Sequence, residues 1–120
     1  MFTLPPSVQI LVATAPTDLR KSFDGLSVLV SSALGRDPLE GSLYVFYNRR
    51  RNQVRVLFWD RTGYCIFAKR LARGTFHFAE QAGAMGAVEI EAPELSLILE
   101  GIDLRHAKRA LRWRPEQKAA

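Results

Sequence analysis

The sequence predicts a single α+β domain, in which an antiparallel β-meander sheet has two or three helices packed on it. Short segments rich in β-branched and aromatic residues alternate with polar turns in the middle of the chain, as they do in a meander. The segments on either side repeat their apolar residues every three or four positions, as amphipathic helices do. With 120 residues, 48% of them hydrophobic, the chain is long enough to bury a core of its own.

The amino-terminal part is predicted to form a strand and then a helix. Residues 8–14 are short and rich in β-branched side chains, which is typical of a strand. After a break at residues 16–18, apolar residues recur at spacings of three and four over residues 23–33, which indicates a helix. Ser22 is expected to be its N-cap, with the hydroxyl accepting from a first-turn amide. Gly35 is expected to end it.

Three predicted strands follow one another at residues 43–48, 53–59 and 64–70. Their connections are short and polar, as hairpin loops are. Gly63, in the second connection, is expected to take the positive φ that such turns need. The middle strand is apolar on both faces, so its second face requires a covering layer, a partner subunit or a ligand, of which we favour a partner.

The last part of the domain is predicted to contain two short strands and a helix. Residues 73–78 and 88–90 are interpreted as the strands, with a loop between them. Pro93 suits the first turn of the helix, and Gly101 is expected to be its C-cap. The apolar stripe of this helix is Leu95, Ile98 and Leu99.

Charge is segregated along the chain, whose formal net charge is +5. Basic residues dominate residues 43–79 and again the tail at 105–120, while the stretch between them is acidic. A polyanion-binding surface requires such segregation, although a solvated surface has the same composition. We expect the domain to span residues 5–104 and the basic tail to fray.

The chain is expected to be soluble and cytoplasmic. Its first six residues lack the charged start and long apolar stretch of a signal peptide. No apolar run approaches the roughly 20 residues of a membrane span, so no membrane partner is expected. Cys65 is the single cysteine and cannot form an intramolecular disulfide, which suits reducing conditions.

The strongest candidate site is the predicted hairpin tip Arg49–Arg50–Arg51–Asn52. Neighbouring arginines repel one another unless an anion is present, and guanidinium groups bind phosphate bidentately or read guanine. A loop kept soluble by its charge is the alternative. If the third strand of the meander ends beside this turn, further cations extend the patch. The predicted nucleic-acid-binding residues are Arg49, Arg50, Arg51, Arg55, Lys69, Arg70 and Arg73.

A second candidate site is apolar. Leu57, Trp59 and Phe67 are interpreted as a face on which a protein partner docks. For Trp59, packing in the core or an interface is a better explanation than base stacking. For Trp113, in the tail, contact with nucleic acid or a partner and packing back onto the domain are equally open.

The residues give little support for catalysis. His77 and His106 lie in different contexts and Cys65 has no neighbouring cysteine, so no metal-ligand spacing is present. Neither a phosphate-binding loop nor a dinucleotide-binding glycine pattern occurs. Carboxylates that a metal-dependent nuclease would need, such as Asp18 and Asp60, are better explained by a helix start and a turn. We therefore expect no metal, no cofactor and no enzymatic activity.

Several separated strings match one family in order along the chain. The chain resembles the TnpB-type accessory proteins of the sixty-six group of insertion sequences, which are distinct from the RNA-guided nucleases of the same name. The resemblance implies a bacterial transposon protein that is encoded beside a DDE-type transposase and helps transposition. It brings no catalytic residues with it. The matching strings are Thr17–Leu26, Leu43–Phe46 with the arginine turn, Val54–Asp60, Phe67–Gly74 and Leu99–Asp103.

Two hypotheses for function follow. The first is a non-catalytic accessory protein of transposition that binds nucleic acid, transposon DNA above all, through the basic hairpin surface. The alternative is a protein–protein adaptor that docks on the transposase or another transposon-encoded protein, with the basic charge incidental. Both can hold at once, and association with further copies of the chain is left open. A small nuclease is a minor third hypothesis.

Overall fold

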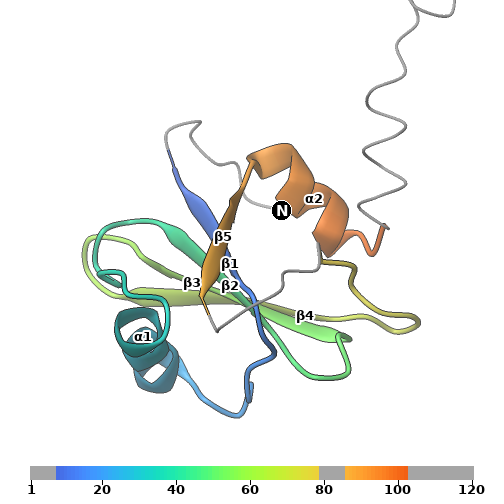
Figure 1. The fold of residues 1–120 in the computed structure, drawn as a ribbon, viewed down its shortest axis with the longest axis horizontal. Helices are drawn as coiled ribbons and strands as arrows, with labels where there is room; N and C mark the ends of the chain where they lie inside the picture. The colour runs from blue at the N-terminus through green and yellow to red at the C-terminus, as the bar shows by residue number, and fades with distance from the viewer. Residues whose placement is uncertain (1–7, 79–85, 103–120) are drawn as a thin grey trace, which may run out of the picture.

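The computed structural model describes residues 8–78 and 86–102. These residues form five strands and two helices, and the strands make one sheet in the order β4–β3–β2–β1–β5 (Figure 1). The predicted α+β class is confirmed. The elements along the chain are β1 (Ile10–Ala13), α1 (Phe23–Ser32), β2 (Leu43–Tyr47), β3 (Gln53–Trp59), β4 (Tyr64–Arg70), β5 (Ala87–Ile90) and α2 (Ala92–Leu99).

The sheet is mixed, although most of its pairs are antiparallel. β2, β3 and β4 form the predicted meander through two antiparallel pairs. β1 instead lies parallel to β2, with Leu11 opposite Tyr44, because the chain crosses over through α1 between them. β5 pairs antiparallel with the other side of β1. The parallel pair is the feature that the antiparallel prediction did not contain.

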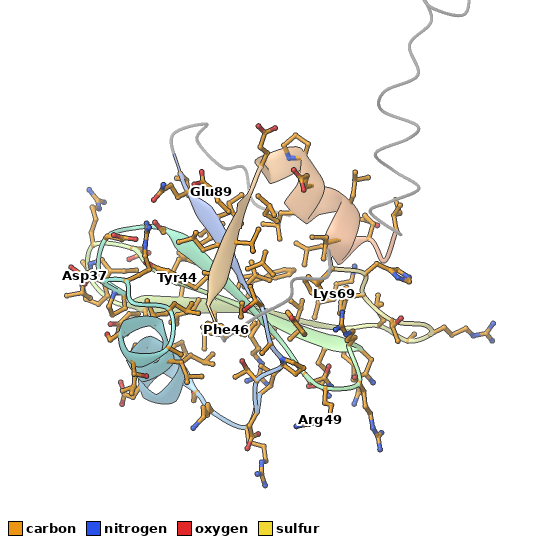
Figure 2. The ribbon with its side chains drawn as sticks, viewed as in Figure 1. Asp37, Tyr44, Phe46, Arg49, Lys69 and Glu89 are labelled. Carbon is orange, nitrogen blue, oxygen red and sulfur yellow. The ribbon has the colours of Figure 1, made fainter. Side chains whose placement is uncertain are left out.

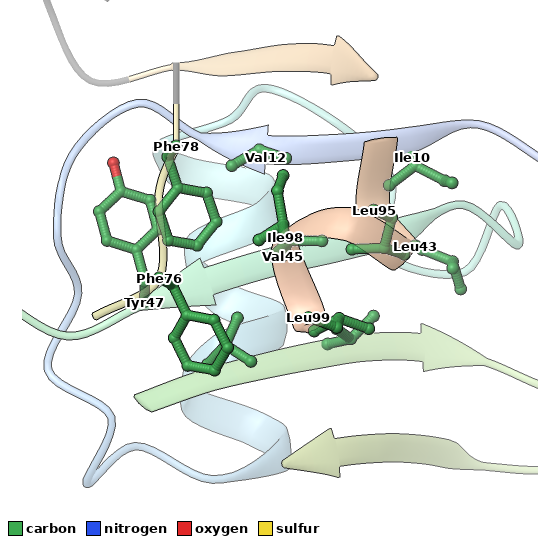
Figure 3. Packing of buried hydrophobic residues seen from close by; sticks show 12 residues of the cluster. Ile10, Val12, Leu43, Val45, Tyr47, Phe76, Phe78, Leu95, Ile98 and Leu99 are labelled. Atoms are coloured by element: carbon green, nitrogen blue, oxygen red, sulfur yellow. The ribbon is translucent and has the colours of Figure 1, made fainter. Parts of the chain in front are cut away.

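Alternation of side chains along the strands gives the sheet two apolar faces, and one helix covers each. α2 packs on the first face, shown in Figure 3, and α1 packs on the second. The buried residues on the α2 side are Ile10, Val12, Leu43, Val45, Tyr47, Val54, Val56, Phe76, Phe78, Leu95, Ile98 and Leu99. Those on the α1 side are Leu11, Ala13, Leu19, Leu26, Val30, Tyr44, Phe46 and Leu57.

The second face of β3 is therefore covered by the chain itself. Leu57 is completely buried in the cluster that contains Leu26 and Val30 of α1. The prediction that a partner covers this face of β3 is wrong. The periodicity of a strand shows that an apolar face must be covered, but it does not show which segment covers it. α1 covers it here.

Residues 73–78 do not form the predicted strand. They run as an irregular segment whose Phe76 and Phe78 are buried on the α2 side of the sheet. Phe78 stacks on Tyr47 with ring centroids 4.2 Å apart. The alternation that suggested a strand thus comes from Phe76 and Phe78, whose side chains fill the core although this segment does not pair with the sheet as a strand.

The helix ends and turns follow the predictions in part. Gly35 and Gly101 have positive φ values of 66° and 80° at the ends of the two helices, as expected. Ser22 occupies the N-cap position of α1, but its side chain makes no capping hydrogen bond. In the turn between β3 and β4, Arg61 takes the positive φ of 70° that was expected of Gly63. The predicted tail at 105–120 lies outside the described residues.

Candidate nucleic-acid interface

The arginine-rich connection between β2 and β3 is a tight turn held by Asn48. The Oδ1 atom of Asn48 accepts hydrogen bonds from the backbone N–H groups of Asn52 and Gln53, each at 3.0 Å. The N–H of Arg51 donates to the carbonyl oxygen of Asn48, also at 3.0 Å, and Arg51 has a left-handed φ of 59°. Because the backbone and Asn48 hold this turn, the arginine side chains are not needed to form it.

The three arginines of the turn have different surroundings. Arg49 and Arg50 are exposed, and neither forms an ion pair with an acidic residue in the described part of the chain. Figure 2 shows Arg49 projecting away from the sheet. Arg51 is half-buried, with its guanidinium carbon 5.3 Å from the centre of the Tyr47 ring, a cation–π contact. Arg49 and Arg50 are thus the cations that this turn offers to a ligand.

The end of β4 lies beside this turn. The prediction that further cations extend the basic patch required this position. Gln53 pairs with Arg70, and the N–H of Leu71 donates to the carbonyl oxygen of Asn52 at 2.9 Å. Arg70 and Arg73 are both exposed. The paired ends of the two strands also border a shallow hollow of about 310 Å³, which is lined by Gln53, Val54, Arg55, Ala68, Lys69 and Arg70.

Arg55 and Lys69 lie on opposite faces of the sheet and each has a partner inside the protein. Arg55 is half-buried on the α1 side, and its Nη1 donates to the carbonyl oxygen of Leu19 at 2.8 Å. Lys69 is on the α2 side, where its Nζ donates to the carbonyl oxygen of Leu99 at 2.6 Å. Leu99 is the last residue of α2, so the ammonium complements the negative end of the helix dipole. The predicted cations therefore do not form one continuous patch.

The loop between β1 and α1 packs against the arginine turn. The N–H of Thr17 donates to the carbonyl oxygen of Tyr47 at 2.8 Å, which joins the loop to the end of β2. Together the two segments enclose a hollow of about 320 Å³, which is lined by Pro16, Thr17, Asp18, Leu19, Asn48, Arg49 and Arg50. We call these two segments, residues 16–21 and 48–51, the basic junction.

The loop adds charged groups of its own to the basic junction. The guanidinium group of Arg20 binds the carboxylate of Asp18, with Nη2 2.7 Å from Oδ2 and Nε 3.0 Å from Oδ1. Hydrogen bonds from the side chain and then the backbone of Arg20 lower the pKa of Asp18 to about 2. Lys21 is exposed, and its stem lies against Gly25, where an added Cβ would come within 3.0 Å of Lys21 Cβ.

The charge segregation seen in the sequence exists in space in part. In Figure 2 Glu89 lies at the upper side of the molecule and Arg49 at the lower side. Glu89 and Glu91 are exposed on and beside β5, and Glu100 is exposed at the end of α2. The basic junction thus lies away from Glu89, which would otherwise repel a polyanion. Glu100, in contrast, follows Leu99, the residue whose carbonyl oxygen Lys69 binds.

Comparison with known proteins identifies the family of this chain. A family model described as IS66 Orf2-like protein matches residues 8–109, which include the whole described domain. The chain belongs to the IS66 Orf2-like family. This is an accessory family of IS66 transposition, as the resemblance in the sequence implied.

Two relatives of this IS66 Orf2-like protein come from Sinorhizobium fredii (strain NBRC 101917 / NGR234). The chain is 39% identical to the uncharacterized protein y4hO over 109 residues, which are 91% of each chain. It is 37% identical to the uncharacterized protein y4jC over 112 residues, 93% of this chain and 94% of the relative. No solved structure matches the chain significantly.

Sequence reasoning missed the loop residues of the basic junction in this IS66 Orf2-like protein. Thr17, Arg20 and Lys21 are distant from the arginine turn in the sequence, and no local pattern places them beside it. The available signal was the family resemblance, because the Thr17–Leu26 string matches the family and had no function assigned to it.

The three residues predicted as a partner face do not share one surface. Leu57 is buried beneath α1, whereas Phe67 lies opposite Val56 and packs on the α2 side. Trp59 is half-exposed and meets the ring of Tyr64 edge-on, with centroids 5.1 Å apart. Of the set, Trp59 is thus the residue whose position on the rim of the sheet suits contact with another molecule.

The carboxylates considered for metal-dependent cleavage take part in local turns. Asp18 binds Arg20, and the Oδ1 atom of Asp60 accepts from the hydroxyl of Thr62 at 3.3 Å. Within residues 8–78 and 86–102, no group of three or more His, Cys, Asp or Glu side chains is placed to hold a metal ion. No helix in the same part of the chain is long and apolar enough to cross a membrane. His106 and Trp113 lie outside the described residues.

Proposed function

We propose that this IS66 Orf2-like protein assists transposition as a non-catalytic protein that binds nucleic acid, transposon DNA above all, through the basic junction. The proposed site of action is the cytoplasm, with no cofactor or metal involved. One observation supports the proposal most directly: two family-matching strings, distant in the sequence, meet around one hollow that the exposed Arg49 and Arg50 border. Exposed guanidinium groups beside a polar hollow are suited to phosphate.

The proposed contacts divide the predicted cations into three groups. Arg49 and Arg50 bind phosphates directly, and Arg70 and Arg73 extend the contact from the neighbouring end of β4. Arg55 and Lys69 have backbone carbonyls as partners, so we assign both to holding the fold. Arg51 forms the third group: its guanidinium is held over the Tyr47 ring, so it adds positive charge beside the binding surface without projecting into it. Phosphate contacts position the protein, so sequence choice requires additional base contacts.

The test is binding of labelled transposon-end duplex and of a scrambled duplex of equal length, across a series of salt concentrations. Changing both Arg49 and Arg50 to alanine is expected to weaken binding and to reduce the salt slope by about 0.9 for each lost phosphate contact. As a matched loss of one charge, Arg49→Ala is compared with Arg61→Asn in the β3–β4 turn, where asparagine tolerates the positive φ. An unchanged slope in the double variant would contradict the proposal.

A protein-docking role is the second candidate, and the edge of the sheet favours it. Among the described strands β4 pairs with β3 alone, so its other edge has unpaired backbone groups. The half-exposed pair of Trp59 and Tyr64 lies at the start of that edge. We propose this edge as the docking surface for the transposase or another transposon-encoded protein.

Co-purification with the transposase after nuclease treatment tests this second candidate. It is expected to persist in the Arg49 and Arg50 double variant and to be lost when a proline replaces Ile66 in the middle of β4. Light scattering of the purified protein, compared with that of the proline variant, shows whether the same edge pairs two copies of the chain instead. Failure of the transposase to co-purify would leave the nucleic-acid role alone.

A further inference from the structure

Thr17 has a polar group that the fold leaves unused. Its side chain is buried, with 8% of the residue exposed, and its hydroxyl oxygen has no hydrogen-bond partner in the described part of the chain. The backbone N–H of the same residue is occupied by the carbonyl oxygen of Tyr47. A buried hydroxyl without a partner is unfavourable, and such groups in a folded protein call for a specific explanation.

The position of Thr17 supplies that explanation. Thr17 borders the 320 Å³ hollow of the basic junction together with Arg49 and Arg50, which approach it from the other segment. A hydroxyl donor and two guanidinium groups on residues that border one hollow match the several acceptor oxygens of a phosphate group. Asp18 borders the same hollow, but its carboxylate is already bound by Arg20.

We infer that this hollow is the seat of one phosphodiester group of the bound nucleic acid, with the Thr17 hydroxyl donating to a non-bridging oxygen. Arg49 and Arg50 neutralise the charge of that phosphate. The hydroxyl oxygen is shielded from solvent in the unliganded protein. The inferred contact therefore requires the Thr17 side chain to rotate toward the hollow when the phosphate binds. The inference rests on the proposed function, because it names the ligand group and the neutral donor within the same site.

The Thr17→Val variant separates a ligand contact from a structural role. Valine has nearly the shape of threonine and removes a polar group that is unpaired in the free protein, so the midpoint of urea unfolding is expected to stay the same or rise. Binding to the duplex is expected to weaken by about tenfold, the size of one hydrogen bond to a charged group. The salt slope is expected to stay that of the wild type, because no cation is removed.

Thr17→Ser is the matched control, since it keeps the hydroxyl and loses a methyl group. Serine is expected to retain wild-type affinity to within about threefold. If valine and serine weaken binding equally, the contact is one of packing and the inference is overturned. If Thr17→Val binds like the wild type while the Arg49 and Arg50 double variant binds weakly, the Thr17 contact is overturned and the proposed function stands.

A titration with inorganic phosphate distinguishes two sources of the phosphate group, the backbone of a nucleic acid and free phosphate. Backbone amide signals of Thr17 and Arg49 are followed by NMR in the wild type and in Thr17→Val. Weak, saturable shifts that valine abolishes, together with tight binding of the duplex, support the inference. The same shifts without duplex binding would make this a free-phosphate site and overturn both the nucleic-acid source and the proposed function. If the duplex binds, phosphate causes no NMR shifts and Thr17→Val leaves the duplex affinity unchanged, the phosphate site is overturned and the proposed function stands.

Discussion

Arg55 ties β3 to the loop that precedes α1, because its Nη1 atom donates a hydrogen bond to the carbonyl oxygen of Leu19 at 2.8 Å. Leu19 is buried in the α1 side of the core, so the bond connects a central strand to a loop that is itself anchored. The side chain predicted to bind phosphate thus holds one half of the basic junction in place. We therefore expect Arg55 to affect a ligand of the basic junction through this loop.

Replacing Arg55 with methionine keeps most of the aliphatic stem and removes the donor. We expect the free energy of unfolding to fall by about 1–2 kcal/mol, because the carbonyl of Leu19 loses its partner in a half-buried place. Urea unfolding followed by circular dichroism measures the change. Arg70→Met, on the same face but exposed, is the control and is expected to change stability by less than about 0.5 kcal/mol. Equal losses in the two variants would contradict a specific role for the Leu19 bond.

Lys69 is expected to stabilise α2 without contributing to nucleic-acid binding. Its ammonium donates to the carbonyl of Leu99 at the carboxyl end of the helix, so Lys69→Met should lower the free energy of unfolding by about 0.5–1 kcal/mol. Affinity for the duplex, measured at fixed salt, should stay within about twofold of the wild type. A large loss of duplex affinity with unchanged stability would show that Lys69 contacts the nucleic acid directly.

Tyr44 connects the core to the loop between α1 and β2. Its buried hydroxyl donates to Glu40 Oε1 at 2.7 Å and is 3.1 Å from the carbonyl oxygen of Asp37. Burial first, and then the Glu40 carboxylate, raise the pKa of Tyr44 from 10.0 to about 12. The neutral hydroxyl is therefore favoured in the folded state, and its stabilisation is complete below pH 10 and lost as the pH rises through 12.

Tyr44→Phe should accordingly cost about 1–2 kcal/mol at neutral pH, by removing hydrogen bonds to a carboxylate and a carbonyl. The same change should make the loss of stability between pH 10 and 12 shallower. Burial also raises the pKa of Tyr47, so part of the alkaline loss should remain. Urea unfolding at a series of pH values measures both effects. An alkaline loss as steep as that of the wild type would show that Tyr44 does not titrate in this range.

Asp18 is expected to restrain the basic junction. Its pKa is lowered from 3.8 to about 2 by hydrogen bonds from Arg20, so the pair stabilises the fold above pH 3.8 and loses this contribution as the pH falls through 2. Asp18→Asn should make that acid loss shallower. It should also tighten duplex binding at low salt and steepen the salt slope, by up to about 0.9, because Arg20 becomes free for a phosphate.

Glu89→Gln is the control for Asp18→Asn, since it removes the same charge on β5, away from the junction. Its effect on duplex affinity is expected to be smaller than that of Asp18→Asn at every salt concentration, because screened charges act over about 10 Å at 0.1 M salt. Equal gains in the two variants would mean that net charge alone governs binding.

The local elements were predictable because each depends on neighbouring residues. The alternation in residues 53–59 and 64–70 predicted β3 and β4 with the bounds that the structure has, and Pro93 and Gly101 marked the ends of α2 closely. Residues 73–78 show the limit of the same reasoning. The aromatic residues Phe76 and Phe78 alternate there as in a strand, yet their rings are fixed by packing against Tyr47.

The sequence by itself determined the class of the domain, its family and the presence of an arginine turn, because these depend on local periodicity and on the identity of short strings. Only the tertiary structure decided that β1 runs parallel to β2, that α1 covers Leu57, and that Thr17 lies beside Arg49. These relationships join segments far apart in the chain. Which apolar faces bury one another is settled by the packing of the whole core, and no local pattern contains that information.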